Sequence, residues 1–324
     1  MKASIYTIIA LLAFAANSLF CRMALADGDI DAWRFTVIRL LSAAGCLGVI
    51  MTIYTYRLRG QVSNLDTLPN ETRSILNDKG SWLSSVSLVV YALCFSIAYT
   101  ALDTGTGALI LFSAVQLTMI GWGIYQKEQL SVVQWVAFLL AVAGFIYLML
   151  PSAAVPSLLA AALMAISGIA WGIYSIRGKS CASPLRATGF NFIRSLMAVP
   201  ILLLLSMTYL DNAGWDGLYL ENFNLDNFLD NFNLNSITVK GILLACASGA
   251  IASGIGYSIW YTAMPLLKNT QAAVVQLCVP VLAALLGVVF LSEPLTPRFI
   301  MASVIILGAV LVFILNKEKS SKPA

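Results

Sequence analysis

Charged and amide side chains inside apolar stretches are the residues of this sequence best suited to chemistry. Arg39 and Arg194 each lie several residues inside an apolar run, where a charge costs about 3 kcal/mol or more at the centre of a bilayer. Each arginine could line a cavity and attract an anionic or zwitterionic solute. The alternative is a structural arginine that snorkels or binds carbonyl groups near a helix end. Asn17, Gln116 and Gln276 are amides in the same setting, and each must bind either a solute or a neighbouring helix.

Aromatic residues at helical spacing form a second set of candidates. Trp171 precedes Ser175 by four residues and Tyr257 precedes Tyr261 by four, so each pair lies on one face of a helix. Tyr99 aligns with Tyr261 in the internal repeat described below. These residues could stack against an aromatic or cationic solute and act as gates. The alternative is the belt of Trp and Tyr that ordinarily marks the ends of membrane helices.

Catalytic and metal-binding constellations are missing from the sequence. The chain has no histidine, which excludes Ser-His-Asp and Cys-His catalysis and histidine-ligated metals. Its six cysteines occur singly, so they predict neither a zinc site nor a disulfide framework. All 15 acids lie in loops or at the ends of apolar runs, which leaves a membrane-embedded enzyme or a proton relay without a mid-membrane carboxylate. We therefore expect no cofactor, no metal and no enzymatic activity.

The elements that position the candidate residues are apolar helices. The 324 residues are 60% hydrophobic and 10% charged, with a mean hydropathy of +0.86, whereas about 25% of the residues of a soluble domain are charged. Runs of about 20 apolar residues can cross about 30 Å of hydrocarbon as helices. They predict an all-α membrane protein with ten transmembrane helices. The predicted spans are 4–25, 33–56, 82–102, 104–125, 130–150, 155–176, 187–210, 237–262, 270–291 and 297–315.

Basic residues are distributed unequally between alternate loops. Most of the 19 Lys and Arg fall on the side that holds both ends of the chain, which predicts cytoplasmic N- and C-termini. Residues 57–81 are then a basic cytoplasmic loop, and the acidic, Asn-rich residues 211–236 are a periplasmic loop of low complexity. The net charge of +4 is too small to indicate a nucleic-acid partner.

The two halves of the sequence repeat one another in the same order. The matched segments are 35–43 (FTVIRLLSA) with 190–198 (FNFIRSLMA), 95–102 (FSIAYTAL) with 257–264 (YSIWYTAM), and 128–131 (EQLS) with 293–296 (EPLT). Because each unit holds five spans, an odd number, the second unit must be inverted relative to the first. This predicts a five-plus-five inverted repeat of residues 1–150 and 151–324, the arrangement that secondary transporters use for alternating access.

This pattern resembles the drug/metabolite transporter superfamily, and in particular its EamA-type members. The resemblance rests on Arg39 and Arg194 near the start of the second span of each half, on the corners at Glu128 and Glu293, and on the Gly-rich turn at 104–109. It implies a carrier of the bacterial inner membrane, often an exporter of amino acids or other metabolites. Its partners would be a small-molecule solute and the lipid bilayer.

The leading hypothesis is therefore a secondary transporter that moves an amino acid-like or other small organic solute, in the direction of efflux, by alternating access. An importer or exchanger of the same fold, and a membrane sensor or scaffold without transport, are the alternatives. Glu128 and Glu293 are assigned a structural role at the helix corners, ahead of the capping candidates Ser131 and Thr296. The sequence leaves open the substrate, the coupling ion, and whether the protein is a monomer or a homodimer.

Overall fold

The structure, a computed structural model, describes residues 2–60, 70–127, 130–149, 157–178, 181–210, 237–263 and 275–320. These residues are mainly helical and include no strand, which confirms the predicted all-α class. The first half contains α1 (Lys2–Ala26), α2 (Ala32–Gly60), α3 (Asn70–Asn77), α4 (Trp82–Ala98), α5 (Thr104–Tyr125) and α6 (Val132–Met149). The second half contains α7 (Leu158–Gly178), α8 (Pro184–Ser195), η2 (Leu196–Ala198), α9 (Val199–Leu210), α11 (Val239–Cys246), η5 (Ala247–Ile255), α12 (Gly256–Ala263), α14 (Cys278–Leu291) and α15 (Pro297–Ser320).

Six helical segments of the described chain are long and apolar enough to cross a membrane, namely Ser4–Ala26, Ala32–Arg57, Thr104–Tyr125, Leu158–Gly178, Leu185–Leu204 and Val239–Trp260. Shorter apolar helices cover Trp82–Ala98, Val132–Leu148, Cys278–Leu291 and Pro297–Phe313. Each segment overlaps a predicted span, so the positions of these helices are confirmed. A membrane crossing by all ten, and their inverted arrangement, stay predictions.

Polar residues at the helix starts provide hydrogen bonds to backbone groups that hydrocarbon cannot satisfy. The side chains of Ser81, Ser183 and Thr238 each accept a hydrogen bond from the backbone N–H three residues further along. Ser131 and Thr296 do the same at the starts of α6 and α15, as expected for helix caps. These caps satisfy backbone N–H groups in the first turn of each helix, so the apolar helices can begin directly after short turns.

Two of the long helical segments depart from regular α geometry inside the bundle. The 3-10 turn η2 joins α8 to α9 just ahead of Pro200, which has no N–H to donate to the preceding turn. The π-helix η5 joins α11 to α12, and the hydroxyl of Ser253 donates to the carbonyl of Ser248 across five residues, at 2.9 Å. Helical segments of π geometry are frequent at functional sites, and Ser248 contacts the site described below.

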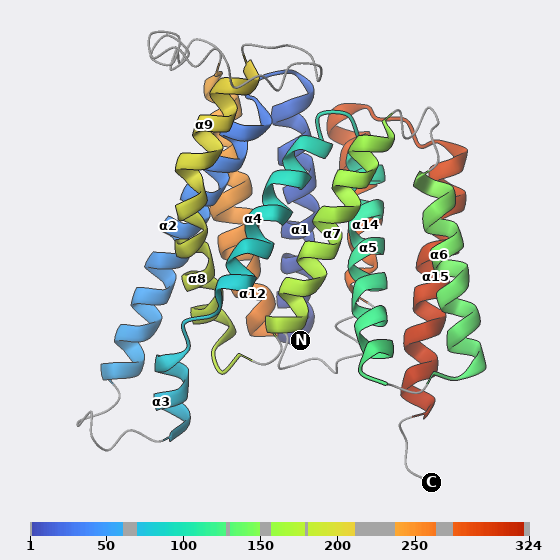
Figure 1. Cartoon of the computed structure of the whole chain (residues 1–324), viewed down its shortest axis with the longest axis horizontal. Helices are drawn as coiled ribbons and strands as arrows, with labels where there is room; N and C mark the ends of the chain where they lie inside the picture. Colours follow the sequence, from blue (N-terminus) through green and yellow to red (C-terminus); the bar gives the residue numbers. More distant parts are fainter. Residues whose placement is uncertain are drawn as a thin grey trace.

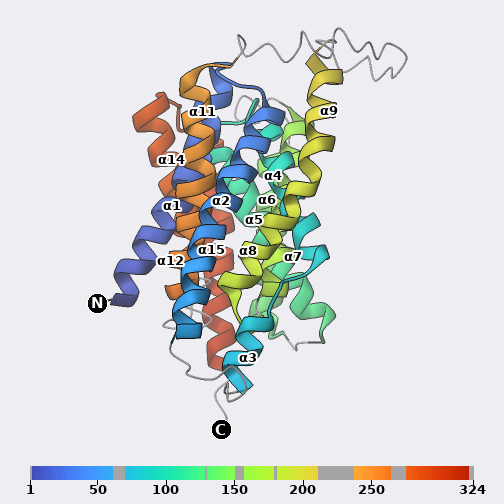
Figure 2. The ribbon, with the colours of Figure 1, turned by 90° about the vertical axis from the view of Figure 1, so that its left-hand side faces the viewer.

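The first and last helices place both ends of the described chain on one side of the bundle. Figure 1 shows that α1 begins and α15 ends at the same end, which we call the terminal face. The turns between α1 and α2, α4 and α5, and α14 and α15 lie at the opposite end, which we call the distal face. The pair α6 and α15 flanks the bundle in Figure 1, and Figure 2 shows α11 packed beside α1 and α2.

Helices α5 and α7 pack closely at Gly168. A Cβ atom at this position would lie 2.5 Å from the carbonyl oxygen of Leu111 and 2.6 Å from the Cβ of Ala114. Small residues allow helix backbones in membranes to approach in this way. Gly121 on α5 differs, because a Cβ there would have no atom within 4 Å.

We expect Gly168→Ala to lower the melting temperature of the purified protein, because the added methyl group forces α5 and α7 apart at a cost of about 1–3 kcal/mol. Gly121→Ala is the matched control and should leave the melting temperature unchanged or raise it. Equal melting temperatures for the two variants, measured in the same detergent, would contradict the close contact at Gly168.

Candidate functional site

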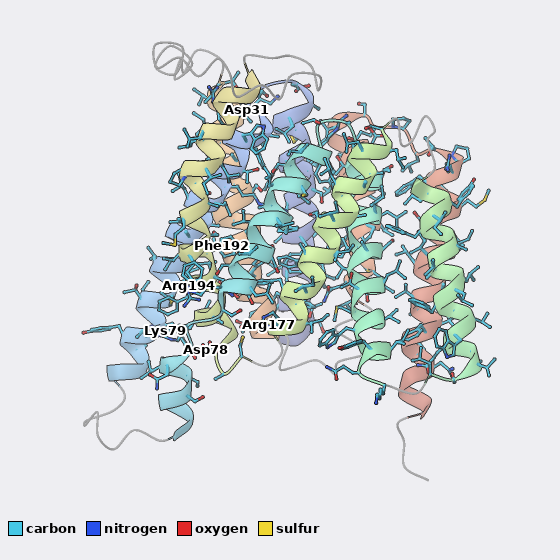
Figure 3. All side chains as sticks on the ribbon, viewed as in Figure 1. Asp31, Asp78, Lys79, Arg177, Phe192 and Arg194 are labelled. Carbon is cyan, nitrogen blue, oxygen red and sulfur yellow. The ribbon has the colours of Figure 1, made fainter. Side chains whose placement is uncertain are left out.

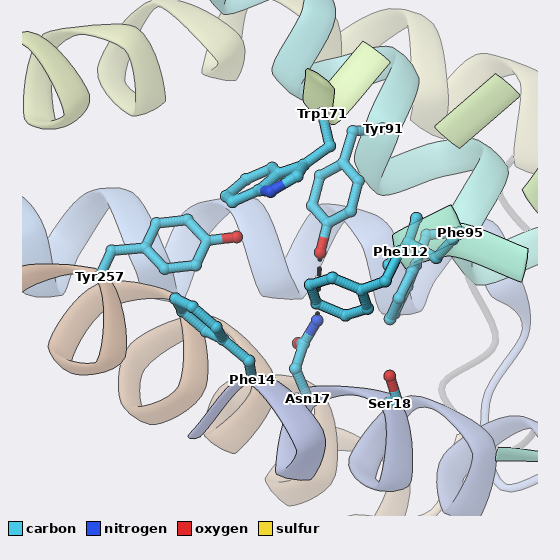
Figure 4. A pocket seen from close by; sticks show the side chains of 9 residues that line it. Phe14, Asn17, Ser18, Tyr91, Phe95, Phe112, Trp171 and Tyr257 are labelled. Carbon is cyan, nitrogen blue, oxygen red and sulfur yellow. Dashed lines mark hydrogen bonds between the residues drawn. The ribbon is translucent and has the colours of Figure 1, made fainter. Parts of the chain in front are cut away.

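A small cavity lies inside the bundle where helices from both halves of the chain meet. It is lined by Phe14, Asn17 and Ser18 of α1, Tyr91 and Phe95 of α4, Leu111 and Phe112 of α5, Trp171 of α7, and Tyr257 of α12 (Figure 4). The volume open to the centre of a water molecule is about 20 Å³, which is room for one water. The side chains of the wall therefore fill most of the space between the helices.

A chain of hydrogen bonds connects the cavity wall to two further helices. The hydroxyl of Tyr91 accepts hydrogen bonds from Arg39 Nη2 at 2.9 Å and from Asn17 Nδ2 at 3.2 Å. Asn17 Oδ1 accepts in turn from the hydroxyl of Ser248 at 2.7 Å. The network joins α1, α2, α4 and η5. The Tyr91 hydroxyl also hydrogen-bonds Tyr257, so it connects the network to α12.

Arg39 lies directly behind the wall of the cavity and is 2% exposed. Its guanidinium carbon is 5.0 Å from the ring centroid of Tyr91 and 4.8 Å from that of Phe95, within the range of cation–π attraction. Its Nη1 atom is buried without a hydrogen-bond partner, and none of the ion pairs among the described residues includes Arg39. The arginine therefore places an uncompensated positive charge beside the cavity.

Three predicted site residues, Asn17, Trp171 and Tyr257, come together in the cavity wall, and Arg39 lies next to it. The Trp171 ring centroid is 4.8 Å from that of Tyr91 and 5.0 Å from that of Tyr257. Figure 4 shows the hydroxyl of Tyr257 directed toward the space between these rings. Residues separated widely in the sequence thus form one aromatic enclosure with a polar side.

The other predicted residues lie elsewhere. Arg194 donates from Nη1 to the carbonyl of Lys79 at 2.6 Å, beside the ring of Trp82, near the terminal face (Figure 3). Gln116 is buried in α5 and Gln276 is half-buried just before α14, but neither lines the cavity. Glu128 and the side chain of Tyr261 lie outside the described residues, so their predicted roles stay predictions.

A separate polar cluster ties three segments together at the distal face. Glu293 accepts hydrogen bonds from the backbone N–H of Thr104 at 2.8 Å, from its hydroxyl at 3.1 Å, and from Arg22 Nε at 3.4 Å. Arg22 also donates to the carbonyl of Tyr99 at 3.0 Å and lies 3.8 Å from Asp103. These contacts join α1 to the turn between α4 and α5 and to the turn between α14 and α15. They also explain why α4 ends at Ala98, before the predicted end of the span at 102: the carbonyl of Tyr99 has left the helix to bind Arg22.

The gate candidate Tyr99 lies next to this distal cluster. It is fully buried, its hydroxyl donates to the carbonyl of Thr104 at 3.3 Å, and its ring lies against Gly107, where a Cβ would overlap it. Its ring also packs edge-to-face on Phe95, with 4.7 Å between the centroids. A direct line of aromatic contacts therefore runs from the cavity wall to the distal cluster.

Burial changes the proton affinity of the distal acids. It raises the pKa of Glu293, and the hydrogen bonds from Thr104 and the charge of Arg22 offset this effect only in part. Burial also raises the pKa of Asp103 against the opposing charge of Arg22. An acid with a raised pKa in the folded state binds its proton more tightly when the protein is folded. Proton binding by such an acid therefore stabilises the folded protein fully below the unfolded-state pKa, and this stabilisation is lost as the pH rises through the folded-state pKa.

The sequence alone did not identify several residues of the two clusters. Tyr91, Phe95 and Phe112 were missed because aromatic residues in an apolar run are indistinguishable from ordinary packing residues. Arg22 and Asp103 were missed as partners of Glu293 because they lie far from it in the sequence. One signal was present for Arg22, which matches Arg177 at the offset that relates Arg39 to Arg194.

The chain is similar to known proteins in sequence and in fold. Residues 158–315 match the model of the EamA-like transporter family. The uncharacterized protein PA1977 of Pseudomonas aeruginosa is 40% identical over 304 residues, which cover 94% of this chain and 91% of that protein. An uncharacterized transporter of Archaeoglobus fulgidus is 25% identical over 227 residues, covering 69% and 72% of the two chains. A crystal structure of another protein is similar in fold, with a TM-score of 0.54 and 15% identity over 97% of each chain.

We expect the melting temperature of the protein to rise as the pH is lowered from about 7 to about 5, because the distal acids take up protons more readily when folded. Glu293→Gln should remove much of this rise. Asp29→Asn is the matched control: the hydrogen bond from Lys240 lowers the pKa of Asp29, so the contribution of Asp29 is lost only at lower pH. A Glu293→Gln protein with an unchanged pH profile would contradict this account.

Proposed function

This chain belongs to the EamA-like transporter family, and we propose that it is a secondary transporter that moves a small organic solute across the bacterial inner membrane by alternating access. The observation that carries the proposal is the cavity lined by α1, α4, α5, α7 and α12, because both halves of the chain contribute to its wall. A site at the interface between repeats is where alternating access requires a solute to bind.

The packing of the helices supports a five-plus-five inverted repeat of residues 1–150 and 151–324. The third predicted span of the first half, α4, packs on the first span of the second half, α7. The third span of the second half, formed by α11, η5 and α12, packs on α1. The fourth spans follow the same exchange, since α5 packs on α7 and α14 packs on α1. Contacts that are exchanged in this way are expected when two similar units are related by a pseudo-two-fold axis.

The distal cluster supports the assignment of a conformational state, whereas the direction of transport follows from the family resemblance. We assign the terminal face to the cytoplasm because the Lys- and Arg-rich loops belong to it. The contacts of Arg22 and Glu293 then close the periplasmic side. A carrier in this state has its periplasmic gate shut, and release of a solute requires these contacts to part. We propose efflux as the working direction, with Tyr99 as the gate residue above the cavity.

The orientation can be tested with reporter fusions. Fusions after residue 324 and within residues 57–81 should report a cytoplasmic location, and fusions within residues 211–236 should report the periplasm, because the basic loops are retained inside. Fusions that place residues 211–236 in the cytoplasm and the C-terminus in the periplasm would reverse the orientation. A C-terminus on the opposite side from residues 57–81 would contradict the ten-span inverted repeat.

Transport can be tested in proteoliposomes. A panel of labelled amino acids and organic acids should include at least one solute that shows counterflow with the protein and none in protein-free vesicles. Trp171→Ala should lower the rate at low solute concentration by about tenfold, equivalent to ~1.4 kcal/mol, because it removes one side of the enclosure. Trp122→Ala is the matched control, since Trp122 lies on α5 with 44% of its surface exposed.

Equal rates for the Trp171→Ala and Trp122→Ala proteins would place the solute path away from this cavity. A complete lack of counterflow by the folded protein across the panel would favour the sensor or scaffold. Experiments with solute preloaded on one side only then distinguish efflux from import and exchange.

A further inference from the structure

The charge of the central site restricts the solutes that it can hold. We propose that the transported solute is a small organic anion, with a carboxylate attached to an aromatic or apolar body, and that Arg39 selects it by its charge. This inference rests on the proposed transport function and narrows that function to one class of substrate.

The first argument is the balance of charge. Arg39 is almost completely buried, and buried cations are ordinarily paired with an acid. The ion pairs of the described residues instead lie near the distal face, where Arg22, Arg34 and Lys240 bind aspartate or glutamate. No acid occurs in the interior of any apolar run. A solute with a negative charge would therefore supply the counter-charge that the protein itself does not provide to Arg39.

The second argument is the unpaired hydrogen-bond donor of Arg39. Arg39 Nη1 has no hydrogen-bond partner. The hydroxyl groups of the wall (Figure 4) are already engaged, because Tyr257 hydrogen-bonds Tyr91 and Ser18 hydrogen-bonds Tyr99. A carboxylate accepts hydrogen bonds and offers none, which matches the unpaired N–H group of Arg39. An ammonium group would meet no carboxylate in the wall and would be repelled by Arg39.

The third argument is the polarity of the rest of the wall. Phe14, Phe112 and Trp171 present aromatic surface to the cavity, and Phe14 meets Tyr257 edge-to-face with 5.7 Å between the ring centroids. An aromatic or aliphatic body would bury its apolar surface against these rings. The polar and apolar parts of the wall match in chemistry an anion with one charged end and one apolar end. Because the cavity of this state has room for one water, the rings have to part before such a solute can enter.

The lack of an acid in the spans has a consequence for energetics. A carboxylate that crosses without a protonatable partner moves one negative charge across the membrane, so its transport is electrogenic. A membrane potential that is negative inside drives an anion outward, with about 2.3 kcal/mol per charge for 100 mV. Efflux of an organic anion therefore needs no proton coupling in this protein.

The test uses three compounds that share a phenyl ring and differ in charge: 3-phenylpropanoate, phenylalanine and 2-phenylethylamine. Ligands that bind the folded state raise its melting temperature in a concentration-dependent way. We expect 3-phenylpropanoate to stabilise the purified full-length protein with an apparent affinity at least about tenfold tighter than that of 2-phenylethylamine, which corresponds to ~1.4 kcal/mol. Phenylalanine should bind more weakly than the anion, because its ammonium group is repelled.

The variants separate selection by Arg39 from a general effect on folding. Arg39→Gln should reduce the preference for the anion by about tenfold, and Arg39→Lys should retain part of it. Tyr91→Phe keeps the aromatic ring and removes the hydroxyl, so it tests the hydrogen bond to Arg39 if Arg39→Gln does not fold. Arg194→Gln is the matched control: it changes the repeat counterpart of Arg39, which lies outside the cavity wall, and should leave the preference unchanged.

Flux measurements provide an independent readout. Efflux of 3-phenylpropanoate from proteoliposomes should accelerate when potassium and valinomycin impose an inside-negative potential, and should slow when the potential is reversed. Three results would each overturn the anion proposal. They are an efflux rate that does not depend on the membrane potential, tighter binding of the amine or of phenylalanine than of the anion, and an unchanged preference for the anion in both Arg39→Gln and Tyr91→Phe. Counterflow of amines or zwitterions alone would overturn it while leaving the transport function standing, whereas no counterflow of any solute would overturn the transport function itself.

Discussion

Hydrocarbon solvates charge poorly and offers no hydrogen bonds, and the interior of this protein is organised around a guanidinium group placed under that constraint. The rings of Tyr91 and Phe95 face the cation of Arg39, and the Tyr91 hydroxyl accepts one of its hydrogen bonds. Asn17 donates a second hydrogen bond to the Tyr91 hydroxyl and accepts one from the hydroxyl of Ser248. Because these side chains come from α1, α2, α4 and η5, the need to accommodate one cation determines how four helices meet.

The two polar clusters of the bundle stabilise their buried arginines in different ways. At the distal face, Arg22 contacts two acids and two backbone carbonyls, at a depth where partial hydration lowers the cost of separating them. Arg39 has aromatic rings and a hydroxyl but no acid. The distal cluster pairs its charges internally, which suits a contact that opens and closes. Arg39 has no acid partner, which suits a site where a solute supplies the counter-charge. Tyr99 and Phe95 lie in contact between the two clusters.

The repeated segments have acquired different surroundings. Arg39 and Arg194 occupy matched positions in the two halves, yet one is enclosed in the bundle and the other binds the carbonyl of Lys79 beside Trp82. The cause lies in the neighbouring segments. Gly249 of η5 lets the backbone of α2 approach closely at Arg39, while α8 meets the linker between α3 and α4. Two segments that match in sequence can thus come to have different chemical surroundings.

The sequence by itself was sufficient to locate the apolar helices, because a segment in hydrocarbon must satisfy its backbone hydrogen bonds internally and therefore has to be long, apolar and helical. It also excluded histidine chemistry and singled out Arg39, Asn17, Trp171 and Tyr257 as unusual residues. It did not locate the polar helix α3 (Asn70–Asn77), which lies within the predicted loop 57–81. Only the tertiary structure decided which of the two matched arginines lies beside a cavity and which aromatic residues enclose it. Asn17 and Ser248, for example, are 231 residues apart and still form a hydrogen bond. Such contacts depend on which helices pack against one another. The local hydrophobic pattern does not indicate these pairings, because lipid and protein interiors favour the same apolar side chains.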